Sequence, residues 1–348
     1  MRKVITALLL SCLCACAAII VGCQANTTAD EDWHTGPHPE TIEITQDTIP
    51  AEMFHTPSQA GSYERLDYEG ISLGETSEKY AYVYLPYGYD ASDTETRYDV
   101  MYLFHGYGGD ITTFMGSPDS PRDLKTVVDN LIANNSMNPM IIVSATFYPA
   151  NGGPDIDMDA FADYKTELIE RLIPAVEGTY NTYATSTDAA GIKASRDHRI
   201  FAGFSMGGAM VCQHMATCMD YFRYWLCMSG AIYWAVHDYG DSYGNVGDGA
   251  WVGDYLAQHI QEQGYGSNDF YLYMVTGTSD VAYDDMLKQV SALESNDFFV
   301  FDNETATGNA SFWLGEDEHH NYQAKRRYLY NALPVLSALI NKQAASAS

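Results

Sequence analysis

The sequence predicts an α/β fold in which a mainly parallel central sheet carries helices on both faces. Short apolar runs, typical of buried strands, alternate with segments whose apolar residues recur every three or four positions, as on one face of a helix. Strands that alternate with helices imply crossover connections and therefore parallel pairing. The chain of 348 residues is long enough for one large domain with a sizeable core.

Each element follows from its local pattern. A strand rich in tyrosine precedes Pro86, and further apolar runs end at His105, at the glycine-rich Gly203 motif and before Gly277. Proline interrupts two of the helical patterns, at Pro174 and Pro334. The expected strands are residues 79–85, 98–104, 139–144, 199–204, 224–229, 270–276 and 311–314, and the expected helices are residues 124–133, 161–176, 209–217 and 323–340.

The amino-terminal residues 1–23 predict an export signal that lies outside the folded domain. Two basic residues are followed by an apolar stretch and then by Gly22-Cys23, which resembles a bacterial lipobox in which Cys23 receives a lipid. Ordinary signal cleavage or an uncleaved anchor of about 18 residues are the alternatives. We expect a flexible tether over residues 24–60 and the folded domain over residues 61–348. The protein would lie on the extracellular face of the bacterial membrane, held only through its lipid, or would be secreted.

Charge and cysteine content exclude several classes of function. Asp and Glu number 46 against 18 Lys and Arg, a net charge of −28, which is the wrong sign for nucleic-acid binding. Cys212, Cys218 and Cys227 remain after processing, and six helical residues would separate the first two by about 9 Å, beyond disulfide reach. We therefore expect buried thiols. No metal-ligand spacing is present, and we expect a monomer without metal or cofactor.

A candidate nucleophile lies in the motif Gly203-Phe204-Ser205-Met206-Gly207-Gly208, between an expected strand and an expected helix. This is the context of a nucleophile elbow, in which a sharp turn presents the serine hydroxyl above the sheet. Bulky neighbours two residues to either side would collide, so glycines are required there. The alternative is a glycine-rich turn with a capping serine.

An acyl-transfer site also needs backbone donors for the developing oxyanion. The amide after the nucleophile, Met206, and one from the loop that follows the 98–104 strand, Tyr107, are the candidates. We expect His105 to hold that loop by hydrogen bonds and not to react. In this fold the acid and then the histidine follow the serine along the chain.

The acid and the histidine are sought among residues that follow Ser205. Asp280 is the favoured acid because it ends a strand and a glycine turn. The sequence pair His319-His320 precedes the last helix, and the pattern alone does not choose between the two. Rival carboxylates are Asp284, Asp285, Glu316, Asp317 and Glu318.

From about residue 78 to residue 336 the chain resembles carbohydrate esterase family 1, the feruloyl and acetylxylan esterases, within the esterase D-like α/β-hydrolases. It is especially similar to the esterase modules of bacterial xylanases. The resemblance implies an α/β-hydrolase sandwich, and it selects His320, because the family's histidine lies ten residues before a Tyr-Asp/Asn-x-Leu-Pro run. The matching motifs are Tyr82-Val83-Tyr84-Leu85-Pro86 with Gly88-Tyr89-Asp90, Tyr102-Leu103-Phe104-His105-Gly106, Ala202 to Gly208, Met228-Ser229-Gly230, Thr276-Gly277-Thr278-Ser279-Asp280 and Tyr330-Asn331-Ala332-Leu333-Pro334.

The resemblance implies a Ser205–His320–Asp280 triad acting on feruloylated or acetylated plant polysaccharide. Trp234 and Tyr233, with the Tyr107 side chain, are candidates for the wall that binds an aromatic acyl group. Hydrolysis of feruloyl esters on arabinoxylan is the favoured function, and acetylxylan or another carbohydrate ester is the first alternative. Acyl transfer to an alcohol, as in mycolyltransferases, and non-catalytic glycan binding are the others.

Overall fold

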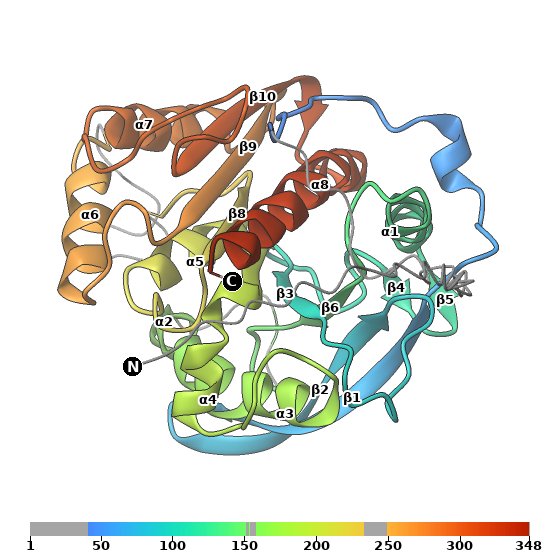
Figure 1. Ribbon diagram of the computed structural model, residues 1–348. Coiled ribbons are helices and arrows are strands. Elements are labelled where there is room, and N and C mark those ends of the chain that lie inside the picture. Colours follow the sequence, from blue (N-terminus) through green and yellow to red (C-terminus); the bar gives the residue numbers. More distant parts are fainter. Residues whose placement is uncertain (1–40, 151–152, 154–157, 233–248, 348) are drawn as a thin grey trace, which may run out of the picture. The chain divides into compact units, whose positions relative to one another are not determined.

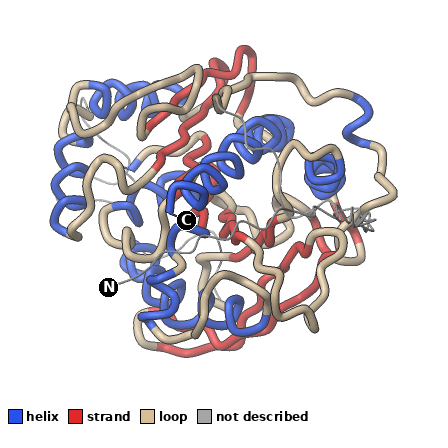
Figure 2. Tube along the Cα trace, in the orientation of Figure 1, coloured by secondary structure: helices blue, strands red, loops and turns tan. Residues whose placement is uncertain are grey.

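The computed structural model describes residues 41–150, 153, 158–232 and 249–347. In this part of the chain eight strands form one sheet in the order β1-β2-β6-β3-β7-β8-β9-β10 (Figures 1 and 2). The strands are β1 (Ser62–Ser72), β2 (Glu75–Leu85), β3 (Asp99–Phe104), β6 (Met140–Ala145), β7 (Arg199–Phe204), β8 (Tyr224–Met228), β9 (Tyr271–Ser279) and β10 (Ala310–His319). A separate two-stranded ribbon consists of β4 (Gly116–Ser117) and β5 (Ser120–Pro121).

The sheet is mainly parallel, as predicted. All neighbours from β6 to β10 pair in parallel, while β1 pairs antiparallel with β2, and β2 antiparallel with β6. Strand β1 was not predicted, because it is an edge strand in which most side chains are polar or only partly buried. The parallel arrangement brings the carboxyl ends of β3, β7, β8, β9 and β10 to one edge of the sheet.

Helices cover both faces because the strand side chains alternate. Along β3, Tyr102 and Phe104 enter one apolar core, whereas Met101 and Leu103 enter the other. The first core is closed by helices α2 (Met158–Glu167), α3 (Ile173–Thr179), α5 (Met206–Met215), α6 (Val252–Glu262) and α7 (Tyr283–Glu294), and the second by α1 (Asp123–Ala133) and α8 (Tyr322–Ala347). The short helices α4 (Ala189–Ala194) and η3 (Arg196–His198) precede β7. The layered α/β architecture is confirmed.

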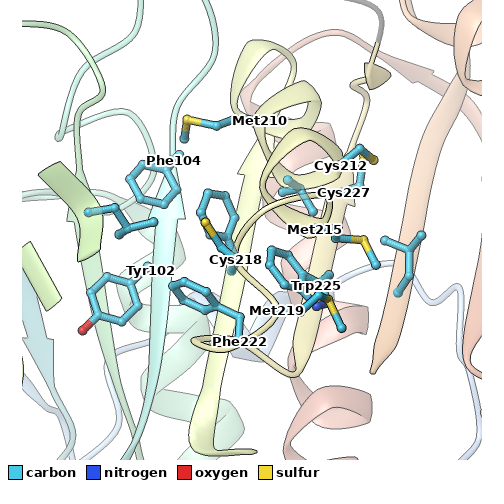
Figure 3. Close-up of a cluster of buried hydrophobic side chains, with 14 of the residues drawn as sticks. Tyr102, Phe104, Met210, Cys212, Met215, Cys218, Met219, Phe222, Trp225 and Cys227 are labelled. Atoms are coloured by element: carbon cyan, nitrogen blue, oxygen red, sulfur yellow. The ribbon is translucent and has the colours of Figure 1, made fainter. Parts of the chain in front are cut away.

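The first core confirms the predicted state of the cysteines. Figure 3 shows Cys212, Cys218 and Cys227 among the methionines and aromatic rings that lie between β3, α5 and β8. All three are buried free thiols, and the sulfurs of Cys212 and Cys227 lie 3.9 Å apart.

The two proline predictions have different outcomes. Before Pro174 the chain forms a π-helical turn, η2 (Leu168–Leu172), between α2 and α3, which is the restart expected of a residue without an N–H donor. The interruption predicted at Pro334 is wrong, because α8 continues through it from Tyr322 to Ala347. Burial of the flanking Leu333 and Val335 against the sheet keeps this helix in place.

The tether predicted for residues 24–60 is wrong for residues 41–60. Ile42 and Met53 are buried, and the 3-10 helix η1 (Ala51–Phe54) lies against α1. The Asn130 side chain of α1 donates hydrogen bonds to the carbonyls of Met53 (3.1 Å) and His55 (2.9 Å). A polar, proline-containing composition therefore marks irregular backbone here, and its few apolar side chains extend the second core. Cys23 and residues 24–40 lie outside the described residues.

The described residues include neither a candidate membrane-spanning helix nor a candidate metal-binding cluster. None of these helices is both long enough and apolar enough to cross a membrane. Nor does this part of the chain hold three or more His, Cys, Asp or Glu side chains grouped as metal ligands.

Candidate active site

Three predicted site residues meet because each follows the end of a parallel strand. Ser205 follows β7, Asp280 follows β9 and His320 follows β10. These strands are close neighbours in the sheet, so their carboxyl ends reach the same rim. Residues that lie 115 positions apart along the chain are thereby brought within hydrogen-bonding distance.

Ser205 occupies a strained turn between β7 and α5. Its backbone has φ +59° and ψ −119°, a conformation that side-chain-bearing residues rarely adopt. A Cβ on Gly203 would lie 2.1 Å from the Gly207 carbonyl oxygen, and one on Gly207 would lie 2.4 Å from that of Phe104. The predicted need for glycine on both sides of the serine is therefore met by the packing of the turn.

The His320 ring bridges the serine and the acid. Its Nε2 lies 2.8 Å from Ser205 Oγ, and its Nδ1 lies 2.7 Å from Asp280 Oδ1. The Phe204 ring packs against the imidazole with ring centres 4.5 Å apart. When Nδ1 carries the proton, Nε2 is free to accept the hydrogen bond from the serine hydroxyl.

Asp280 is buried and accepts further hydrogen bonds. Its Oδ1 accepts from the Ala282 amide at 2.8 Å, and its Oδ2 accepts from the Ser229 hydroxyl at 2.9 Å. Thr276 donates in turn to the Ser229 oxygen at 3.3 Å. Ser229 was not predicted as a site residue, although it directly follows β8, whose end lies at the same rim.

The loop after β3 lies beside Ser205. A Cβ on Gly106 would lie 2.7 Å from the Ser205 Cβ, so only glycine at this position lets the loop lie this close to the serine. His105 is buried, and its ring nitrogens contact the Gly106 carbonyl and the Thr146 hydroxyl, each at 2.8 Å. Burial lowers the pKa of His105 to about 4, which keeps it neutral. The structural role expected for His105 is confirmed.

A cavity of about 360 Å³ opens above Ser205 and His320. Tyr107, a residue that is 64% exposed, lines this cavity, and Met206 lies at the first position of α5 directly after the serine. The remaining lining residues come from the same loop, from the end of β7 and from the starts of α1 and α8: Gly106, Gly108, Gly109, Thr113, Phe204, Arg122, Tyr322 and Lys325. The predicted acyl-wall residues Trp234 and Tyr233 lie outside the described residues.

A second cavity, of about 480 Å³, lies at the amino ends of β8 and β9 and includes none of the three site residues. Three of the rival carboxylates that the sequence offered as the acid lie elsewhere. Asp284 and Asp285 are in the first turn of α7, and Glu318 pairs with Arg327 at 2.8 Å. Of the two cavities, the one above Ser205 is therefore the candidate active site.

Comparisons with known proteins identify the family of the chain. Residues 76–325 match the Esterase family, described as "Putative esterase". The chain is 33% identical over 276 residues to endo-1,4-beta-xylanase Y of Acetivibrio thermocellus, covering 79% of this chain and 23% of that protein. It is 30% identical over 177 residues to an endo-1,4-beta-xylanase/feruloyl esterase of Xylanibacter ruminicola, covering 50% of this chain and 22% of that protein. The chain thus spans less than a quarter of these relatives' length.

A solved structure extends the likeness to three dimensions. A serine-to-alanine mutant of the feruloyl esterase module of Clostridium thermocellum, complexed with sinapinate, superposes with a TM-score of 0.70 at 32% identity, covering 85% of this chain and 95% of that one. The chain therefore belongs to the Esterase family, and it has the α/β-hydrolase fold of its feruloyl esterase relatives.

Proposed function

We propose that the protein is a secreted serine esterase that hydrolyses feruloyl and related hydroxycinnamoyl esters on plant cell-wall arabinoxylan. The observation that carries the proposal is the chain of hydrogen bonds from Ser205 Oγ through His320 to Asp280. Ser205 and His320 line an open cavity. The feruloyl esterase names of the similar proteins support the acyl group, and the xylanase names support the polysaccharide.

In the first half-reaction, Ser205 Oγ attacks the ester carbonyl carbon while His320 Nε2 takes the hydroxyl proton. The carboxylate of Asp280 holds the ring and stabilises the imidazolium that forms. The same Nε2 proton then passes to the departing sugar oxygen as the carbon–oxygen bond breaks, which leaves the acyl group on Ser205. In the second half-reaction, water gives a proton to His320 Nε2 and attacks the acyl carbon. The bond from that carbon to Ser205 Oγ then breaks, the proton passes from His320 to Oγ, and the acid leaves with the serine hydroxyl restored.

The negative charge on the carbonyl oxygen needs donors in both half-reactions. We assign them to the Met206 and Tyr107 amides, because the first lies at the amino terminus of α5 and the second in the glycine loop beside Ser205. The strained elbow keeps Ser205 and the Met206 amide in fixed relative positions without reorganisation during the reaction.

Paired substrates test the proposal. Methyl ferulate and feruloylated arabinoxylan should be hydrolysed, and Ser205→Ala should abolish release of ferulate, whereas the exposed serine variant Ser58→Ala should retain it. Release of acetate from acetylated xylan with no ferulate from either substrate would overturn the acyl assignment. Activity that survives in Ser205→Ala would overturn the mechanism.

We also propose export and lipid attachment through Cys23, on the evidence of the sequence motif. In a bacterial host, the full chain should incorporate labelled fatty acid and sediment with membranes, and Cys23→Ala should do neither. Equal labelling of both proteins would contradict attachment at this residue.

A further inference from the structure

Two cationic side chains line the cavity above Ser205, although the chain as a whole carries a net charge of −28. Arg122 comes from the start of α1 and Lys325 from the first turn of α8. The proposed hydrolysis of a neutral feruloyl ester gives neither of them a function, because the serine, imidazole and carboxylate complete that reaction.

Lys325 is half-buried without a carboxylate partner among the described residues. Its ammonium lies 4.5 Å from the centre of the Phe204 ring, the same ring that packs against His320. Burial, and then the charge of Arg122, lower the pKa of Lys325 to about 8. The lysine is therefore still largely charged at neutral pH, held over an aromatic face at the wall of the cavity.

Arg122 is fixed in place by neutral groups. Its guanidinium stacks 3.7 Å from the centre of the Tyr322 ring, and its Nη1 donates to the Thr113 carbonyl at 2.9 Å. The described residues include no carboxylate within ion-pairing distance of Arg122. Its remaining donors are therefore available to a group that enters the cavity.

The positions of the two cations are unfavourable for the helices that carry them. Arg122 is the N-cap of α1, and Lys325 is the fourth residue of α8, where helix dipoles favour acidic side chains. The carboxylate of Asp123, which follows Arg122 in the chain, is paired with Arg326. Two helix amino termini and two cations thus give this wall of the cavity a positive potential, which an anion would compensate.

We propose that the cavity binds a carboxylate carried by the substrate beside the scissile ester, with Arg122 and Lys325 as its contacts. This inference rests on the proposed function. It narrows the substrate class to esters that carry an ionised carboxylate in addition to the ester group that is cleaved. The carboxylate has two chemical sources, a uronic acid on the alcohol side or a dicarboxylic half-ester on the acyl side. Arginine supplies a planar pair of donors and lysine a point charge, a combination suited to one carboxylate.

The test compares matched anionic and neutral esters. For the alcohol side, kcat/KM is measured on feruloylated galacturonic acid and on feruloylated galactose. For the acyl side, it is measured on para-nitrophenyl hemisuccinate and on para-nitrophenyl butyrate. The wild-type protein should prefer the anionic member of one pair by about tenfold or more, mainly through KM, and added salt should reduce the preference.

Charge removal should collapse that preference. Arg122→Gln and Lys325→Met should each lower the anionic-to-neutral ratio by about tenfold, whereas the control variant Lys288→Met, at an exposed lysine on α7, should keep it. If either variant fails to fold, binding of galacturonate and succinate to the Ser205→Ala protein, measured by calorimetry, replaces the kinetic ratio. Binding of neither anion would then overturn the inference.

The failure of this inference differs from the failure of the proposed function. A wild-type ratio near one in both pairs, with neutral esters hydrolysed and that hydrolysis lost in Ser205→Ala, would overturn carboxylate recognition alone. Variants that merely relieve inhibition by free ferulate, without changing the ratio, would do the same. No hydrolysis of any ester would instead overturn the proposed function.

Discussion

Replacing Asp280 by asparagine separates the charge of the acid from its shape. Asp280 Oδ1 receives two donors, the Ala282 amide and His320 Nδ1, so only an acceptor fits at that position. The asparagine carbonyl oxygen should occupy it, and the amide NH₂ should face Ser229. The Ser229 hydroxyl can then turn its proton toward Thr276 Oγ1, 3.3 Å away. His320 would keep the tautomer in which Nε2 accepts the serine proton.

The expected loss is that of one ion pair in the charged intermediate. Charge centres ~4 Å apart at an effective dielectric constant of ~20 attract by about 4 kcal/mol. A neutral hydrogen bond retains about 1 kcal/mol of this. The remaining ~3 kcal/mol corresponds to a decrease of about a hundredfold in kcat, since each 1.36 kcal/mol is a factor of ten. KM should change little because the substrate does not contact Asp280 in this account.

Initial rates on para-nitrophenyl acetate and methyl ferulate measure this decrease, and thermal unfolding checks that the variant folds. A loss beyond about ten-thousandfold would mean that the amide presents its NH₂ to His320 and fixes the wrong tautomer. A loss below about tenfold would mean that the carboxylate charge does not stabilise the imidazolium. The first result would refute the orientation derived from the Ala282 amide, and the second would refute the role given to the carboxylate charge.

Three further predictions concern stability and the elbow. Burial lowers the pKa of His105 to about 4 and of His214 to about 3, so the unfolded chain takes up protons first as pH falls below ~6.5. The two histidines together should therefore lower the free energy of unfolding, measured by urea titration, by about 4 kcal/mol between pH 7.5 and pH 5. The variant His214→Phe should show about half that decrease, and an equal decrease in the variant and the wild type would contradict this prediction. Burial opposes the charge of both Lys79 and Glu167, whose side chains pair at 2.5 Å, so Lys79→Met should cost about 3–5 kcal/mol in the same measurement. Adding Glu167→Leu to this variant should recover most of the lost unfolding free energy. A double variant less stable than Lys79→Met alone would contradict the prediction. Gly207→Ala places a methyl 2.4 Å from a β3 carbonyl oxygen, so folded protein should lose at least a hundredfold in kcat, about 3 kcal/mol; full activity would mean that the elbow tolerates a side chain.

The sequence was sufficient where local pattern and topology agree. Ser205, Asp280 and His320 could be chosen because strand ends of a parallel sheet share one rim and because glycines flank the serine. The choice of His320 over His319 needed the family resemblance, since both neighbours satisfy the pattern. Residue 320 is the one whose ring lies between the hydroxyl and the carboxylate.

Other features escaped the sequence because their cause is tertiary. Ser229 looks like an ordinary strand-end serine until β8 and β9 align it with Asp280. Arg122 and Lys325 are basic residues at helix amino termini, where acidic residues are usual. Single exceptions of this kind are common in sequences, so they did not predict a binding site. The helix α8 persists through Pro334 because burial against the sheet outweighs one lost hydrogen bond.

The central claim is that His320 activates Ser205, and covalent labelling tests it most directly. After treatment with a fluorophosphonate, intact-mass and peptide analysis should find one adduct, on Ser205. The labelling rate should fall at least a thousandfold in His320→Ala, about 4 kcal/mol, and remain within about threefold of wild type in the neighbouring variant His319→Ala, since an exposed side-chain change is expected to matter little. Labelling of another residue, or equal rates in the two histidine variants, would contradict the account.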